Sequence, residues 1–147
     1  RIGYAVIPKI LEKDMKKIQD TILICPPTIS QYAAAYILNN GQSYVEEKKQ
    51  ALLDNRKIFM EKIADVKTLK KTPIAEGAFY IFIELDSNLN DNNLAISLIE
   101  EHKVATIPGS AFGTSGGCYL RLSYGALSKD QAFNGMERLS SGLNSIL

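Results

Sequence analysis

The stretch GAFYIFIEL, residues 77–85, is the most strongly strand-forming part of this 147-residue sequence. It is rich in aromatic and β-branched residues, and its apolar side chains fall on both faces of an extended chain. A strand of this kind is typical of a sheet that is covered on both sides. We therefore predict a strand at 77–85 with other elements packed against each face.

Helical and extended patterns alternate around this strand. Upstream, residues from Ser43 to about Ala64 carry pairs of apolar residues at seven-residue spacing, which predicts a long amphipathic helix able to join two domains. Downstream, Asp91 is a candidate cap for a helix that ends near His102, and Ser128 with Gln131 forms a capping-box pattern that opens a final helix. Short strands are expected at 66–69, 104–107 and 118–124. The expected inward-facing residues are Leu94, Ala95, Leu98 and Ile99 in the first of these helices and Ala132, Phe133, Met136, Leu139 and Leu143 in the last. The fold class predicted for residues 42–147 is α/β, with helices packed on a small sheet.

Residues 1–41 have a different pattern. An extended stretch at 2–7 precedes a short helix at 9–19, and Thr28 with Gln31 predicts a second helix that starts with a capping box. Gly41 is suited to end that helix in a left-handed cap. One strand and two helices without a sheet of their own indicate the edge of a larger domain.

Composition excludes several classes of protein. The sequence is 46% hydrophobic and 22% charged with a net charge of +1, which is typical of a globular protein and gives no electrostatic footprint for nucleic acid or an anionic membrane. No apolar run approaches the ~20 residues of a membrane span. Cys25 and Cys118 lack the spacing of a zinc or redox motif, so we expect no metal site, two free thiols and a cytoplasmic location.

Two residues, His102 and Arg121, are candidate catalytic or binding groups. His102 is the only histidine and lies where a helical apolar stripe would end, which favours packing at a helix end; a Ser-His-Asp site remains an alternative, although no serine partner stands out. Arg121 lies inside an apolar strand and points to the face opposite Leu120 and Leu122. Such an arginine either forms a structural ion pair, lies on an exposed face, or grips a carboxylate or phosphate with its planar fork.

The segment IPGSAFGTSGG, residues 107–117, precedes the strand of Arg121. Its four glycines do not match a phosphate-binding loop, because neither Gly-Lys-Ser/Thr nor GxGxxG is present. We expect backbone bends at Gly109, Gly113, Gly116 and Gly117, in a loop that adjoins Arg121.

Five landmarks occur in a recognisable order along the chain: RIGY (1–4), PPTISQYAA (26–34), EGAFYIFIEL (76–85), VATIPGSAFG (104–113) and YLRLSYG (119–125). Together they resemble the C-terminal part of the pyridoxal-phosphate-dependent aminotransferases of class I/II, the aspartate aminotransferase superfamily with fold type I. The resemblance implies that residues 1–41 are the C-terminal remnant of the large cofactor-binding domain. It also implies that residues 42–147 are the small domain, beginning with a long inter-domain helix.

The same resemblance assigns two anion anchors. Arg1 corresponds to the arginine that holds the phosphate of pyridoxal 5'-phosphate, and Arg121 to the arginine that holds the α-carboxylate of the substrate. The lysine that carries the cofactor lies upstream of Arg1 in the family, so this chain contributes no catalytic residue and is expected to be inactive alone. The loop at 109–117 is implied to lie at the mouth of the substrate pocket.

The implied parent protein is a homodimer that moves an amino group from an amino acid to a 2-oxo acid, by ping-pong chemistry. The segment QDTILICPP, residues 19–27, lacks the arginine that some aspartate-specific relatives place before the proline pair, so a dicarboxylate substrate has no support there. Two alternatives remain. The same scaffold serves lyases, decarboxylases and cyclising synthases, and the chain could also be a non-catalytic α/β interaction module.

Overall fold

The computed structural model describes residues 2–71 and 75–147. The chain divides into two compact units, residues 1–48 and 49–147, with the division inside the helix α3 (Gln42–Ile63). Each unit is described by itself. None of the described helices is both long and apolar enough to cross a membrane.

The first unit is helical. It contains a 3-10 turn, η1 (Lys9–Leu11), the helices α1 (Glu12–Ile22) and α2 (Thr28–Asn40), and the start of α3. The helix α2 begins at Thr28 as predicted, but the predicted capping box is wrong: no side chain caps the helix, and the Gln31 amide donates instead to the Pro26 carbonyl. The left-handed cap at Gly41 is also wrong, because its φ is −91°. No described residue of this unit is buried.

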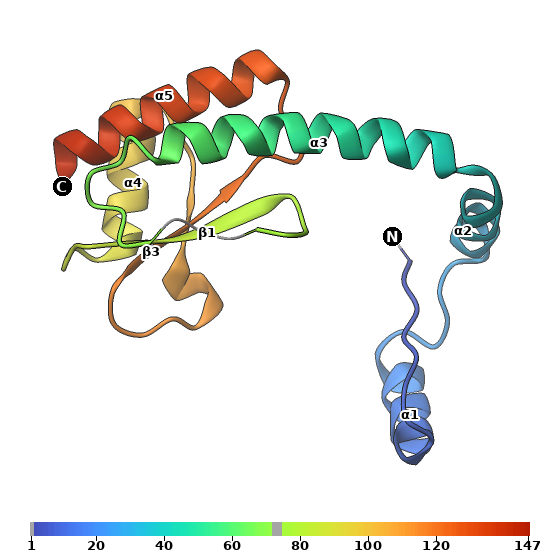
Figure 1. Cartoon of the computed structure of the whole chain (residues 1–147). Coiled ribbons are helices and arrows are strands. Elements are labelled where there is room, and N and C mark those ends of the chain that lie inside the picture. The colour runs from blue at the N-terminus through green and yellow to red at the C-terminus, as the bar shows by residue number, and fades with distance from the viewer. Residues whose placement is uncertain (1, 72–74) are drawn as a thin grey trace. The chain divides into compact units, whose positions relative to one another are not determined.

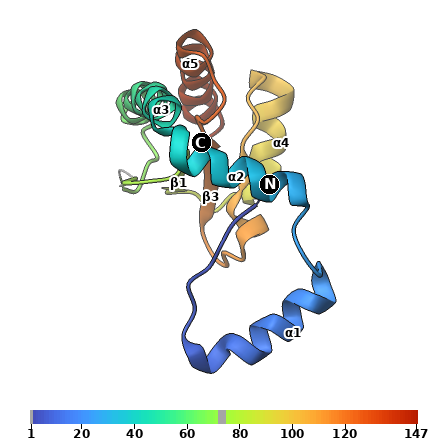
Figure 2. The same cartoon turned by 90° about the vertical axis from the view of Figure 1, so that its right-hand side faces the viewer.

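The second unit is a three-stranded antiparallel sheet with helices. Its elements are the rest of α3, β1 (Tyr80–Leu85), α4 (Asp91–His102), β2 (Ile107–Pro108), the 3-10 turn η2 (Gly109–Phe112), β3 (Cys118–Ser123) and α5 (Lys129–Ile146) (Figure 1). The strand order is β1-β3-β2, so the strand that carries Arg121 is central. The two views show α3 and α5 on one face of the sheet and η2 on the other (Figures 1 and 2).

The face of the sheet toward α3 and α5, the inner face, forms the core. Its strand residues are at most 3% exposed, because alternate side chains of β1 and β3 point to the same side. They are Ile81, Ile83, Leu85, Cys118, Leu120 and Leu122. On the opposite, outer face, Tyr80 and Phe82 are each 38% exposed. The prediction that the 77–85 strand is covered on both faces is therefore wrong for this chain.

The helix starts show one confirmed prediction and one correction. Ser128 and Gln131 form the predicted capping box at the start of α5. The cap of α4 is Asn90, whose side chain accepts from two backbone N–H groups, and Asp91 is the first helical residue.

Two residues predicted to face inward are instead 46–47% exposed, Ile99 on α4 and Phe133 on α5.

Three predicted strands are shorter or absent. The 77–85 strand begins only at Tyr80, because Ala78 has a φ of +60°, which interrupts the extended backbone. Residues 66–69 form a turn with a single bridge, from Leu69 to Leu85. The 104–107 strand reduces to Ile107–Pro108, since the Val104 N–H is used to cap the end of α4.

Candidate functional site

Arg121 lies in the middle of the sheet. It is paired across β3 with Phe82 of β1 on one side and Ile107 of β2 on the other. Its side chain belongs to the outer face, since its neighbours Leu120 and Leu122 are buried in the core. The central strand thus places a cation on the face of the sheet that the helices leave open.

Aromatic rings surround the Arg121 guanidinium. Its Cζ atom lies 5.0 Å from the ring centroid of Tyr80 and 4.8 Å from that of Phe112, within cation–π range of both. The Nε atom is enclosed and has no hydrogen-bond partner, and Arg121 forms no ion pair with any described residue. Arg121 as a whole is only half-buried, so part of its side chain is accessible. A half-buried guanidinium without a counter-ion is suited to a carboxylate or phosphate.

The turn η2 brings Phe112 to this face. Gly109 allows the approach: a Cβ atom there would lie 2.4 Å from the Tyr119 Cβ and 3.1 Å from the Phe82 ring. The rings of Phe82 and Tyr119 stack at 5.6 Å, and the ring of Phe112 meets that of Phe82 edge-on at 6.1 Å. Sequence reasoning missed Tyr80 and Phe112 as partners of Arg121, although Phe112 is prominent in the motif PGSAFG.

Beyond Tyr119, the outer face carries one charged pair that neutralises itself. Lys70 Nζ lies 2.8 Å from a carboxylate oxygen of Glu84. The hydrogen bond from Lys70 lowers the pKa of Glu84, and burial together with the hydrogen bond to Glu84 raises the pKa of Tyr119. Among the strand residues on this face, Arg121 is therefore the charged side chain that has no oppositely charged partner.

The loop between η2 and β3 has the predicted bends. Gly113, Gly116 and Gly117 all have positive φ, between 75° and 101°. Gly109 does not have a positive φ. A glycine is needed there because a Cβ atom would collide with neighbouring side chains. The loop enters β3 three residues before Arg121, as the sequence indicates.

The other candidate residues lie away from Arg121 or outside the described chain. Arg1 is outside the described residues. His102 packs at the end of α4 against α5, with its Nε2 3.4 Å from the Ser145 Oγ, as expected for a residue at a helix end. Both cysteines are free, Cys25 exposed and Cys118 buried, and burial raises the pKa of the Cys118 thiol.

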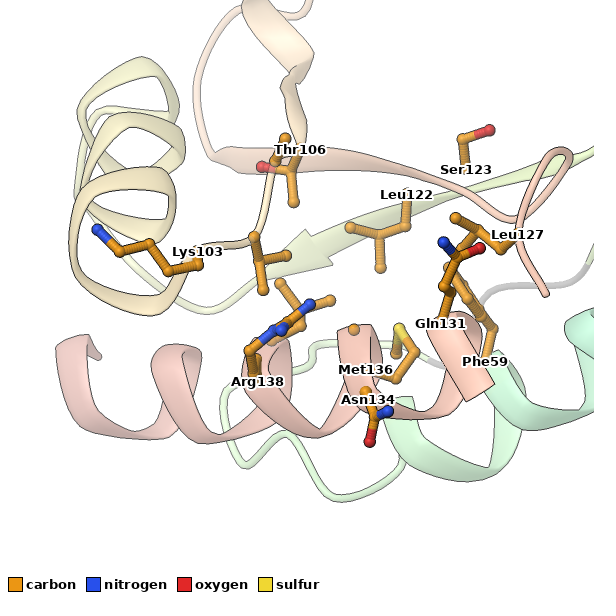
Figure 3. A pocket seen from close by; sticks show the side chains of 14 residues that line it. Phe59, Lys103, Thr106, Leu122, Ser123, Leu127, Gln131, Asn134, Met136 and Arg138 are labelled. Atoms are coloured by element: carbon orange, nitrogen blue, oxygen red, sulfur yellow. The ribbon is translucent and has the colours of Figure 1, made fainter. Parts of the chain in front are cut away.

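A separate cavity of about 460 Å³ lies on the inner side of the sheet, between α5 and the segment that follows α4. Figure 3 shows Arg138 and Gln131 of α5 among its lining residues, together with apolar side chains such as Leu122 and Met136. Arg121 does not line this cavity, since it points to the opposite face. Sequence reasoning did not anticipate it.

Comparison with known proteins gives consistent relatives. The family model described as "Aminotransferase class I and II" matches residues 1–139. The chain is 33% identical to an aspartate aminotransferase of Pyrococcus abyssi, over 95% of this chain and 36% of the relative, and 33% identical to the aromatic aminotransferase ISS1 of Arabidopsis thaliana, over 100% and 38%. The crystal structure of an aromatic aminotransferase from Pyrococcus horikoshii OT3 superposes with a TM-score of 0.77 at 33% identity, covering 95% of this chain and 37% of that one.

Proposed function

The chain belongs to the class I and II aminotransferase family, and on this premise we propose that it is the C-terminal part of a longer pyridoxal-phosphate-dependent enzyme. The reaction proposed for that enzyme is the transfer of an amino group from an amino acid to a 2-oxo acid. The chain spans just over a third of the length of the relatives above, 36% and 38%. Both are named as aminotransferases, which favours transamination over lyase or decarboxylase chemistry and over a non-catalytic module.

The observation that carries the proposal is the unpaired guanidinium of Arg121. Substrates of a transaminase share an α-carboxylate, and a guanidinium fork binds both of its oxygens. Arg121 offers that fork on a rigid central strand, with its charge unneutralised by any described residue. In this proposal Arg121 holds the carboxylate and thereby fixes which bond to the substrate Cα is presented for cleavage.

Pyridoxal phosphate, when bound, withdraws electrons from the substrate Cα so that the proton there can be removed. Of the groups that would hold it, this chain contributes Arg1 by resemblance, as an anchor for the cofactor phosphate. No described residue is assigned to the cofactor. The role of this chain is thus to bind and orient the substrate, while the lysine that carries the cofactor is expected elsewhere in the enzyme.

The domain assignment is part of the proposal. Residues 1–41 are proposed to complete the large domain and residues 42–147 to form the small domain. Large apolar side chains of the first segment are strongly exposed, for example Ile10 at 87% and Ile29 at 79%, which is expected of a segment whose packing partners lie in the rest of a longer protein. A homodimeric, cytoplasmic enzyme is the corresponding proposal for the whole protein.

The test is the substitution Arg121→Lys in the longer enzyme that contains this chain. Lysine keeps the charge but loses the fork, so the KM for the amino acid should rise by about 10- to 100-fold, as expected for a charged hydrogen bond of about 1.5–3 kcal/mol. The matched control is Arg138→Lys, since Arg138 is an exposed arginine on α5 that does not reach the outer face. A KM within about twofold of the unmodified enzyme would refute Arg121 as the carboxylate anchor.

A further inference from the structure

We propose that Asp91 is a positioning residue for Arg121: it holds Ser110, and through the η2 turn it keeps the ring of Phe112 against the guanidinium. The inference rests on the proposed function, in which Arg121 binds the substrate carboxylate. It concerns how a side chain on α4 sets the geometry of an anchor on β3.

The first step is a two-point contact between Asp91 and Ser110. Asp91 is 5% exposed, and one carboxylate oxygen accepts from the Ser110 backbone N–H while the other accepts from the Ser110 hydroxyl, both at 2.8 Å. No lysine or arginine of the described chain pairs with Asp91. A buried carboxylate with these bonds and a place in the first turn of a helix is stabilised without a counter-ion. Because Asn90 already caps α4, the Asp91 carboxylate is available for this contact.

The second step runs through the turn itself. Ser110 and Phe112 are both in η2, and the Gly113 N–H donates to the Ser110 carbonyl, which closes the turn. Gly109, at the start of the turn, is packed against Tyr119. Fixing Ser110 therefore fixes the direction in which the Phe112 side chain leaves the turn.

The third step is the effect on Arg121. Phe112 supplies one of the two rings that contact the guanidinium, and Tyr80 supplies the other. Tyr80 is held by the β1–β3 ladder, whereas Phe112 depends on the short η2 turn. Without the Asp91 contact, the Phe112 ring would lose its fixed place, and the Arg121 Nε would become accessible. The fork would then have to be ordered when the carboxylate binds, which weakens binding.

The direct test is spectroscopic and uses the 147-residue chain. Because the Arg121 Nε is enclosed, its N–H should give a protected signal in a proton–nitrogen NMR spectrum, assigned by its loss in Arg121→Lys. Phe112→Leu should shift that signal and raise its hydrogen-exchange rate by about tenfold or more. Asp91→Ala should do the same, since it removes both carboxylate oxygens that accept from the Ser110 N–H and hydroxyl.

Graded variants and a control separate positioning from general damage. Ser110→Ala removes only one of the two bonds and should give an intermediate effect, while Ser110→Thr keeps the hydroxyl and should restore the signal. Asp130→Ala removes an equivalent first-turn carboxylate from α5, where Asp130 is exposed, and should leave the signal unchanged. The signal of a core backbone amide, such as that of Leu120, reports whether each variant is folded.

Kinetics of the longer enzyme complete the test. Asp91→Ala and Phe112→Leu should raise the KM for the amino acid roughly three- to tenfold, the range of a lost cation–π contact, with kcat nearly unchanged. If Phe112→Leu moves the Arg121 signal but Asp91→Ala and Ser110→Ala do not, the proposed positioning is refuted even if Arg121 binds the carboxylate. If the Phe112→Leu, Asp91→Ala and Ser110→Ala variants all move the Arg121 signal but Arg121→Lys leaves the KM for the amino acid unchanged, the positioning stands and the proposed function fails.

Discussion

Gly109→Ala tests how the turn η2 sits on the outer face of the sheet. The added Cβ would lie 2.4 Å from the Tyr119 Cβ and 2.9 Å from the Thr114 Oγ1. The Thr114 hydroxyl can rotate away, but the Tyr119 Cβ is fixed by the backbone of the central strand. Either β3 or η2 must therefore shift, and the turn has fewer contacts than the strand.

The magnitude follows from the cost of inserting a methyl group where there is no space. Overpacking of this kind costs about 1–3 kcal/mol of unfolding free energy, and we expect about 2 kcal/mol for Gly109→Ala. The shift of η2 should also move Phe112 away from Arg121 and expose the Nε atom. The expected result is a lower urea midpoint together with faster exchange of the Arg121 N–H.

The assay is urea unfolding followed by far-UV circular dichroism, with Gly135→Ala as the matched control. Gly135 lies within α5, and a Cβ there would meet nothing within 4 Å, so this substitution should stabilise the chain by about 0.5–1 kcal/mol through helix propensity. The reasoning is refuted if Gly109→Ala leaves the urea midpoint of the unmodified chain unchanged or raises it, as Gly135→Ala is expected to do.

Two further predictions concern residues that support the sheet. Asn55 is 3% exposed and its amide donates to the carbonyls of Tyr124 and Leu127, at 3.3 and 2.7 Å, so Asn55→Ala should destabilise the chain by about 2 kcal/mol in the same urea assay, and a loss below about 0.5 kcal/mol would contradict this role. Lys70 lowers the pKa of Glu84, which means that their interaction stabilises the folded chain above the ordinary pKa of a glutamate and is lost as the pH falls through the lowered value. The urea midpoint of Lys70→Gln should therefore lie below that of the unmodified chain at about pH 7, and the two midpoints should converge at about pH 3. The control is Lys71→Gln, at an exposed lysine, whose midpoint should show no such pH-dependent difference. A difference between the Lys70→Gln and unmodified midpoints that persists in acid would refute the assignment.

Local patterns predicted the parts of the fold whose causes lie within a few residues. The capping box of Ser128 and Gln131 is one example, because both partners are three residues apart on the same turn. The side of β3 to which Arg121 points is another, since alternation along a strand needs no knowledge of its neighbours.

Failures occurred where a distant contact decides the outcome. Ile99 and Phe133 belong to apolar stripes, yet each lies at the edge of the stripe, and only the placement of the neighbouring elements determines which edge is covered. The sequence pattern of residues 66–69 predicted a strand, but these residues form a turn with one bridge, from Leu69 to Leu85. The rings around Arg121 come from β1 and from η2, so their meeting depends on the strand register and on the return of the 109–112 turn.

Asp91 shows how a one-residue difference changes the role of a side chain. The sequence pattern predicted Asp91 as the cap, but the helix uses Asn90, the residue before it. Successive residues of a helix are turned by about 100°, so a start one residue later would aim the Asp91 carboxylate at the backbone of its own first turn instead of at Ser110. Asn90→Ala removes the cap and tests this competition. If the two roles are exclusive, Asp91 should leave Ser110 to take over the cap, and the Arg121 N–H should lose protection although neither residue of the contact has been altered. If the Arg121 signal is unchanged in Asn90→Ala, the Asp91–Ser110 contact fixes the start of α4 without the Asn90 cap. In that case the Asp91–Ser110 contact determines which residue caps α4, and the cap does not determine the contact.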